Sequence, residues 1–244
     1  MVSEVLRSAL NLKKVPDYST ICKAVKRLKE EDLKNLLEES AKLLNVNLDI
    51  LAIDSTGLRE DNSSFYYAKR SGKKRKSWTK MTIVVDYDLQ AIVSSNVGIG
   101  PGNDGVILRE MVEMGEIPSC GILLADSGYD CKSNEKIAVF RPIRRGGCYK
   151  SIDKINLFLG WLFARIIGLY GKRWGVETVF SVIKRRFGDR IKSRSSYSKF
   201  VDSLQHMEVL LSYLYHSSSI PTQLFFNKAI QIKARDFNAQ TTLQ

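Results

Sequence analysis

Four side chains with complementary chemistry recur at helical spacing in one segment of the chain. They are 3, 4 and 7 positions apart in sequence and consist of Tyr170, Arg173, Glu177 and Lys184. At about 100° per residue, these intervals bring them within an arc of about 60° on one side of an α-helix. One carboxylate would then lie between two cations and a phenol. This row is either a functional face or the solvated side of an amphipathic helix, because an Arg and a Glu four apart also occur on ordinary surfaces.

Two aspartates each follow a short apolar run elsewhere in the chain. The segment LDILAIDSTG contains Asp54, and GILLADSGYD contains Asp126. Runs of this length and composition are typical of strands buried on both faces. An Asp at a strand end is also a common turn former, so neither aspartate indicates a catalytic site by itself.

Taken together, these three segments resemble the DDE transposases of prokaryotic insertion sequences, in the group with the Tyr-x2-Arg-x3-Glu-x6-Lys spacing. The resemblance covers residues 15–216 and is carried by AIDSTG, LADSGYD and the Tyr-Arg-Glu-Lys segment. It implies that Asp54, Asp126 and Glu177 are the catalytic acids and metal ligands. It further implies cleavage at the ends of the element, followed by strand transfer into target DNA.

The chemistry of phosphodiester cleavage fits this set of acids. Two divalent cations can activate the attacking oxygen and stabilise the leaving one during an in-line displacement. Hard cations such as Mg²⁺ or Mn²⁺ take oxygen ligands, whereas Cys and His would favour zinc. We therefore expect two such ions, held by Asp54, Asp126 and Glu177, with Asp54 bridging them.

The charge of the chain points to a polyanionic partner. Lys and Arg number 38 against 26 Asp and Glu, which gives a formal net charge of +12. This excess favours double-stranded DNA, both element ends and target, over a membrane surface. The predicted DNA contacts come from the helical row, from its extension and from a dense basic loop, and comprise Tyr170, Arg173, Lys184, Arg185, Lys73, Lys74, Arg75 and Lys76. A merely solvated loop is the alternative interpretation of residues 69–80.

The order of expected elements predicts an α/β fold with a mixed sheet flanked by helices. A strand over LDILAID is followed by a hairpin with strands near 81–86 and 91–97, and its turn contains Asp86 and Asp88. A helix capped by Asn103 or Asp104, the Asp126 strand, a strand near 138–143, the Glu177 helix and a helix near 198–216 follow. The resemblance makes this fold ribonuclease-H-like.

Three parts are expected along the chain. Residues 1–47 form an N-terminal helical segment, either a helix-turn-helix or an ordinary packing unit, which the resemblance implies is a truncated end-binding region. Residues 48–220 form the catalytic domain, and residues 221–244 a polar tail. The apolar run INLFLGWLFARIIGLY is interrupted by Asn156 and Arg165, which predicts a buried helix rather than a membrane span.

The remaining features exclude other classes of protein. Cys22, Cys120, Cys131 and Cys148 are widely scattered and only two histidines are present, which argues against zinc modules and disulfide frameworks. No secretion signal is apparent, so we expect a cytoplasmic, nucleoid-associated protein. The resemblance implies that it acts as a homodimer when two element ends are paired. Three alternatives remain: a catalytically silent DNA-binding remnant, a structure-selective nuclease of the same fold, and a structural interaction protein.

Overall fold

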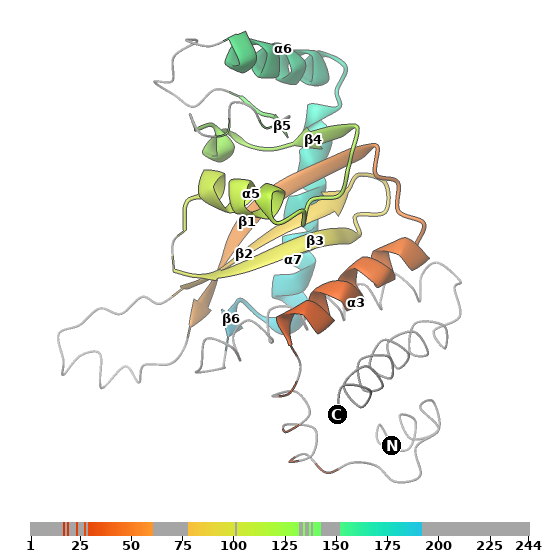
Figure 1. Cartoon of the computed structure of the whole chain (residues 1–244), viewed down its shortest axis with the longest axis vertical. Coiled ribbons are helices and arrows are strands. Elements are labelled where there is room, and N and C mark those ends of the chain that lie inside the picture. The colour runs from red at the N-terminus through yellow and green to blue at the C-terminus, as the bar shows by residue number, and fades with distance from the viewer. Residues whose placement is uncertain are drawn as a thin grey trace, which may run out of the picture.

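A mixed sheet forms the centre of the molecule, and helices cover both of its faces (Figure 1). The structure is a computed structural model that describes residues 29–60, 78–100, 102–131, 139–142 and 152–191, with positions 17, 19, 23, 27, 134 and 137. Its main strands are β1 (Ile50–Glu60), β2 (Trp78–Asp86), β3 (Ile92–Ile99), β4 (Ile122–Leu124) and β5 (Val139–Phe140). A short strand, β6 (Arg190–Ile191), pairs with the far end of β1.

The strand order is β3-β2-β1-β4-β5. The β1–β2 and β2–β3 pairs are antiparallel, whereas β1–β4 and β4–β5 are parallel. Three antiparallel strands, β1 to β3, with parallel strands added on the free side of β1, form the ribonuclease-H-like arrangement. The predicted fold class is therefore confirmed.

Alternation along the strands divides the core into two layers, because successive side chains point to opposite faces of a sheet. Leu51 and Ile53 of β1 pack with α5 (Asp104–Glu113) in one buried cluster. Ala52 and Leu58 pack with α7 (Trp174–Phe187) in the other. Odd-numbered residues of β1 thus face α5, and even-numbered residues face α7.

Further helical elements flank the sheet. The helix α3 (Glu30–Leu43) lies along β3 and adds Leu33 and Leu37 to the α7-side core. Two more elements, α6 (Ile152–Ile166) and the 3-10 turn η3 (Tyr170–Arg173), lead into α7. Within the described residues, no helix is long and apolar enough to cross a membrane.

Several predicted elements agree with the structure. The hairpin has its strands and turn where expected, and Asn103 caps α5 by accepting a hydrogen bond from the Gly105 backbone N–H at 2.9 Å. The end of the predicted N-terminal helical segment corresponds to α3, and the described Cys120 and Cys131 form no disulfide and are partly buried. The predicted helix at 198–216 and the polar tail lie outside the described residues.

The prediction that α6 is a buried helix was wrong. Ala164 is buried, but Ile152, Phe163 and Ile166 are 68%, 63% and 75% exposed. Apolar residues all around a helix indicate burial on every side. Within the described residues, α6 packs on β5 and η3, and these three apolar side chains are left largely exposed.

Asp86 is a structural residue of the hairpin turn, as expected. It is 1% exposed, and its carboxylate accepts hydrogen bonds from the backbone N–H groups of Asp88, Leu89 and Ala91 at 3.0, 2.8 and 2.6 Å. Burial raises the pKa of Asp86, and the three N–H donors oppose that rise.

Removing this carboxylate should destabilise the fold. We expect Asp86→Ala to lower the free energy of unfolding by about 2–4 kcal/mol, because backbone donors lose their acceptor in a buried turn. The measurement is urea denaturation followed by circular dichroism. Asp88→Ala, at an exposed position of the same turn, should cost less than about 1 kcal/mol. Equal losses for the two variants would contradict this role of Asp86.

Candidate active site

The pairing of β1 with β4 sets the two predicted aspartates side by side. The parallel register ends with Ala52 beside Leu124. Extending it by two residues brings Asp54 next to Asp126, at the point where the two strands separate. The carboxyl ends of neighbouring parallel strands, next to a change in strand direction, are where open α/β sheets bind ligands.

Asp54 does not end its strand, in contrast to the prediction. β1 continues to Glu60, because Ser55 to Arg59 remain paired with β2 on the antiparallel side. Asp54 is an even-numbered residue of β1, so its side chain faces α7. The carboxylate therefore lies inside the layer between the sheet and α7, and its side chain is 19% exposed.

Both of the other predicted acids affect the pKa of Asp54. Burial raises the pKa of Asp54, while the hydrogen bond from its neighbour's backbone N–H, at 2.8 Å, and the Arg173 cation lower it. The negative charges of Asp126 and Glu177 raise it further. Each of these two carboxylates thus lies close enough to influence the ionisation of Asp54.

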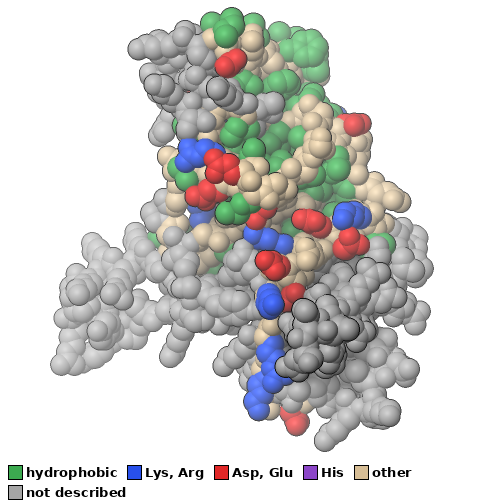
Figure 2. Space-filling model, in the orientation of Figure 1, with side chains coloured by type: hydrophobic (Ala, Val, Ile, Leu, Met, Phe, Trp, Pro, Cys, Tyr) green, Lys and Arg blue, Asp and Glu red, His purple; other side chains and the backbone are tan. Residues whose placement is uncertain are grey.

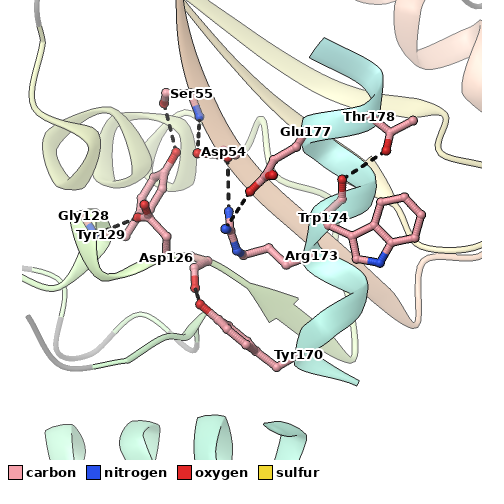
Figure 3. A network of polar contacts seen from close by, with 11 residues as sticks. Asp54, Ser55, Asp126, Gly128, Tyr129, Tyr170, Arg173, Trp174, Glu177 and Thr178 are labelled. Carbon is pink, nitrogen blue, oxygen red and sulfur yellow. Dashed lines mark hydrogen bonds and ion pairs between the residues drawn. The ribbon is translucent and has the colours of Figure 1, made fainter. Parts of the chain in front are cut away.

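The Arg173 side chain donates hydrogen bonds to both Asp54 on β1 and Glu177 on α7 (Figure 3). Its Nη1 donates to Asp54 Oδ2 at 3.2 Å and its Nη2 donates to Glu177 Oε1 at 2.9 Å. Burial opposes the charge on Arg173, but the combined attraction to Asp54, Tyr170, Glu177 and Asp126 outweighs it, and the pKa of Arg173 is raised. The guanidinium therefore neutralises two carboxylates that would otherwise repel one another.

The row from Tyr170 to Lys184 does not lie on a single α-helix, so this prediction needs correction. Tyr170 and Arg173 belong to η3, and α7 begins at Trp174. All four side chains nevertheless point to the sheet side. The Tyr170 hydroxyl donates to the Ala125 carbonyl at 3.2 Å, and Lys184 Nζ donates to Thr56 Oγ1 at 2.6 Å.

Asp126 is held by the turn that follows β4. Its Oδ1 accepts a hydrogen bond from the Gly128 N–H at 2.7 Å and caps the 3-10 turn η1 (Ser127–Tyr129). A Cβ at position 128 would lie 2.9 Å from Asp126 Oδ1. Glycine is therefore needed at position 128, where the backbone and the carboxylate approach so closely.

A chain of three hydroxyl groups joins this turn to the neighbouring strands on the opposite side of β1. The Tyr129 hydroxyl lies 2.9 Å from Ser55 Oγ, which lies 2.8 Å from Thr82 Oγ1. Tyr129 is fully buried, and burial raises the pKa of its phenol, which keeps it protonated. Sequence reasoning missed Ser55 and Tyr129, although both lie in the segments that carry the aspartates.

The donor set suits a hard divalent cation, because Asp54, Asp126 and Glu177 offer only carboxylate oxygens. The arrangement is not that of a closed metal site. Among the described residues, no three Asp, Glu, His or Cys side chains are gathered closely enough to hold an ion. The guanidinium of Arg173 instead lies between Asp54 and Glu177. The ligand chemistry therefore fits Mg²⁺, and the space between two of the ligands is taken by a protein cation.

The other predicted DNA contacts are only partly visible. Arg185 is exposed on α7, where its Nε donates to the Ser181 carbonyl at 3.2 Å. The basic loop with Lys73, Lys74, Arg75 and Lys76 lies outside the described residues.

Comparisons with known proteins extend these observations. A solved structure titled "Crystal structure of a pre-cleavage Mos1 transpososome" is similar at 11% sequence identity, with a TM-score of 0.26, over 88% of this chain and 69% of that chain. No curated protein sequence matches the chain. The family model described as "Transposase DDE domain" matches residues 47–205. Since that match spans more than half of the sequence and includes Asp54, Asp126 and Glu177, the chain belongs to the DDE transposase domain family.

Proposed function

We propose that this protein is a DNA transposase of a prokaryotic insertion sequence, of the group with the Tyr-Arg-Glu-Lys spacing, which cuts at the element ends and joins them to target DNA. The observation that carries the proposal is the position of the Arg173 guanidinium, which donates to Asp54 on β1 at 3.2 Å and to Glu177 on α7 at 2.9 Å, next to the turn that holds Asp126. In this proposal residues 48–220 are the catalytic domain and residues 1–47 contribute to binding element ends. The protein would act on the DNA of the nucleoid, in the cytoplasm.

Asp54, Asp126 and Glu177 would hold the divalent cations, two Mg²⁺ or Mn²⁺ ions. Bound there, the ions would activate the attacking oxygen and stabilise the leaving oxygen of the scissile phosphate. The role of the protein is to fix the ligands: the β1–β4 register sets the two aspartates side by side, and α7 presents Glu177 opposite them.

Arg173 and Lys184, the two cations of the segment from Tyr170 to Lys184, would bind the phosphates next to the scissile bond. Arg173 and Lys184 lie on the same side of the helical segment as Glu177, with their side chains 2.6–3.2 Å from partners on β1. A phosphate entering the site would replace those partners as acceptor. Tyr170 would support the same surface from η3.

The substrate that tests the catalytic proposal is a DNA duplex with the inverted repeat found in the DNA that flanks the reading frame. We expect the purified chain to nick a duplex carrying the inverted repeat of its element in Mg²⁺, and to join the new 3′-end to a second duplex. Glu177→Gln and Asp54→Asn should each lower cleavage at least about a thousandfold, roughly 4 kcal/mol of transition-state stabilisation, while binding is kept.

The matched control for these variants is Glu113→Gln, an exposed carboxylate of α5 whose side chain is 66% accessible. It should cut like the wild type. Cleavage without joining would indicate a nuclease, and binding without cleavage a silent remnant. Cleavage by Glu177→Gln at the wild-type rate would overturn the assignment of the acids.

Arg173 should compete with the metal ions for the carboxylates. We expect Arg173→Gln to bind Mn²⁺ about fivefold more tightly than the wild type, because the acids lose the cation that neutralises them. The measurement is calorimetric titration without DNA. Glu177→Gln should bind Mn²⁺ more weakly than the wild type. Unchanged or weaker Mn²⁺ binding by Arg173→Gln would contradict this competition.

Tyr129 should act as a positioning residue, because its hydroxyl joins the Asp126 turn to the residue that follows Asp54. We expect Tyr129→Phe to raise the Mg²⁺ concentration needed for half-maximal cleavage several-fold, while the free energy of unfolding falls by only about 1 kcal/mol. Thr82→Val, which leaves the Tyr129–Ser55 contact in place, is the control. An unchanged Mg²⁺ requirement in Tyr129→Phe would show that the hydroxyl serves folding alone.

A further inference from the structure

Asp130 and Arg141 are charged residues inside the protein, and the proposed reaction gives neither of them a role. Many Asp, Glu, Lys and Arg side chains are visible on the face of the molecule drawn in Figure 2. The side chains of Asp130 and Arg141 are only 3% and 2% exposed, and their Oδ1 and Nε atoms are 3.8 Å apart. Such a buried ion pair needs an explanation, because taking two charges out of water can cost more free energy than their attraction returns.

The pair lies next to the turn that carries Asp126. Asp130 is the C-terminal cap of η1. Arg141 directly follows β5, and within β5 the Phe140 carbonyl accepts a hydrogen bond from the Ala125 N–H at 3.0 Å. β5 and Arg141 therefore hold the chain on both sides of Asp126.

A further contact ties the same part of the chain to α5. Asn134 is fully buried, and its backbone carbonyl accepts a hydrogen bond from Arg141 Nη2 at 3.0 Å. The Asn134 Nδ2 donates to the Gly105 carbonyl, in the first turn of α5, at 2.7 Å. A Cβ at Gly105 would lie 2.7 Å from Cys131 Sγ, so α5 and the chain that follows η1 approach as closely as glycine allows. Separate nitrogen atoms of one guanidinium thus hold Asp130 and the segment that contacts α5.

We propose that Arg141 is a positioning residue for Asp126, because through Asp130 and Asn134 it fixes the turn that sets the position of the Asp126 carboxylate. The inference rests on the proposed function, in which Asp126 is a metal ligand. Within the turn, the Gly128 N–H donates to Asp126 Oδ1 at 2.7 Å, so a shift of the turn would move the carboxylate with it. Groups that orient a metal ligand without touching the ion typically change metal affinity by about 10- to 100-fold when they are removed.

Positioning and stability can be separated, because a buried ion pair often contributes little net stability. Removing one partner leaves an uncompensated charge in the core, whereas replacing both partners by neutral side chains of similar size is often tolerated. If the pair served folding alone, a neutral replacement that restores stability would also restore metal binding. A positioning role predicts that stability returns and metal affinity does not.

The test compares the full wild-type chain with three variants. We expect Arg141→Met to unfold at a lower urea concentration than the wild type, and the double variant Asp130→Asn with Arg141→Met to recover most of that loss. Calorimetric titration without DNA should give about tenfold weaker Mn²⁺ binding for the double variant. Arg141→Lys keeps the charge but replaces the planar guanidinium by a compact ammonium. It should fold like the wild type and also bind Mn²⁺ more weakly.

The matched control is Arg109→Met on α5. The Arg109 Nε lies 3.8 Å from Glu113 Oε1, the same separation as in the buried pair, but these two side chains are 35% and 66% exposed. This variant should bind Mn²⁺ like the wild type, and a loss as large as in the double variant would overturn the proposal. Wild-type Mn²⁺ affinity in the double variant, or in Arg141→Lys if the double variant does not fold, would overturn it as well.

A second measurement needs neither metal nor DNA. In an amide NMR spectrum the Gly128 N–H reports its hydrogen bond to Asp126 Oδ1. We expect its resonance to move in the double variant and in Arg141→Lys, and to stay in place in Arg109→Met. A Gly128 resonance unmoved by the Arg141 substitutions would overturn the positioning role. A wild type that binds no Mn²⁺, although this resonance responds as expected, would contradict the proposed function alone.

Discussion

Three residues of parallel pairing between β1 and β4 set the geometry of the whole site. Ile50 to Ala52 lie beside Ile122 to Leu124, and both aspartates follow two residues beyond the last pair. A slip of one residue in this register would turn every side chain of one strand to the other face of the sheet. Apolar residues on both faces prevent such a slip, because Leu51 and Ala52 belong to different buried clusters. The core therefore specifies which carboxylates meet.

The two sides of β1 have different roles around this point. Asp54 faces α7, where the charged groups gather, while Ser55 faces α5 and joins a chain of hydroxyl groups that ends at Tyr129. Since Tyr129 belongs to the same turn as Asp126, the hydroxyl groups on the α5 side of the sheet hold the spacing of Asp54 and Asp126. Buried hydroxyl chains with every member paired add rigidity at low electrostatic cost. Charged groups in the same position would also perturb the ionisation of the acids.

Sequence reasoning could predict the features that depend on local pattern. The hairpin, the Asn103 cap and the Asp86 turn follow from alternation and from side chains that bond to nearby backbone. Other features depend on neighbours far along the chain. β1 passes beyond Asp54 because β2 continues to pair with it, and Tyr170 and Arg173 lie in a 3-10 turn because Gly168, with φ of 75°, separates α6 from the segment that follows. The exposed side of α6 could not be foreseen, since composition alone does not reveal which neighbours are present.

Arg173 explains how Asp54 and Glu177 can lie near one another within the fold. Two carboxylates facing one layer between sheet and helix repel one another, and partial burial strengthens that repulsion. A guanidinium is suited to this position because its planar fork offers separate donors to Asp54 and Glu177, whereas a Lys ammonium is a single compact charge. The contact to Glu177 is the more exposed, with 58% of that side chain accessible, so it is the weaker of the two. Of the proposed ligands, Glu177 would therefore exchange the protein cation for an ion most readily, whereas the sheet holds Asp54 in place.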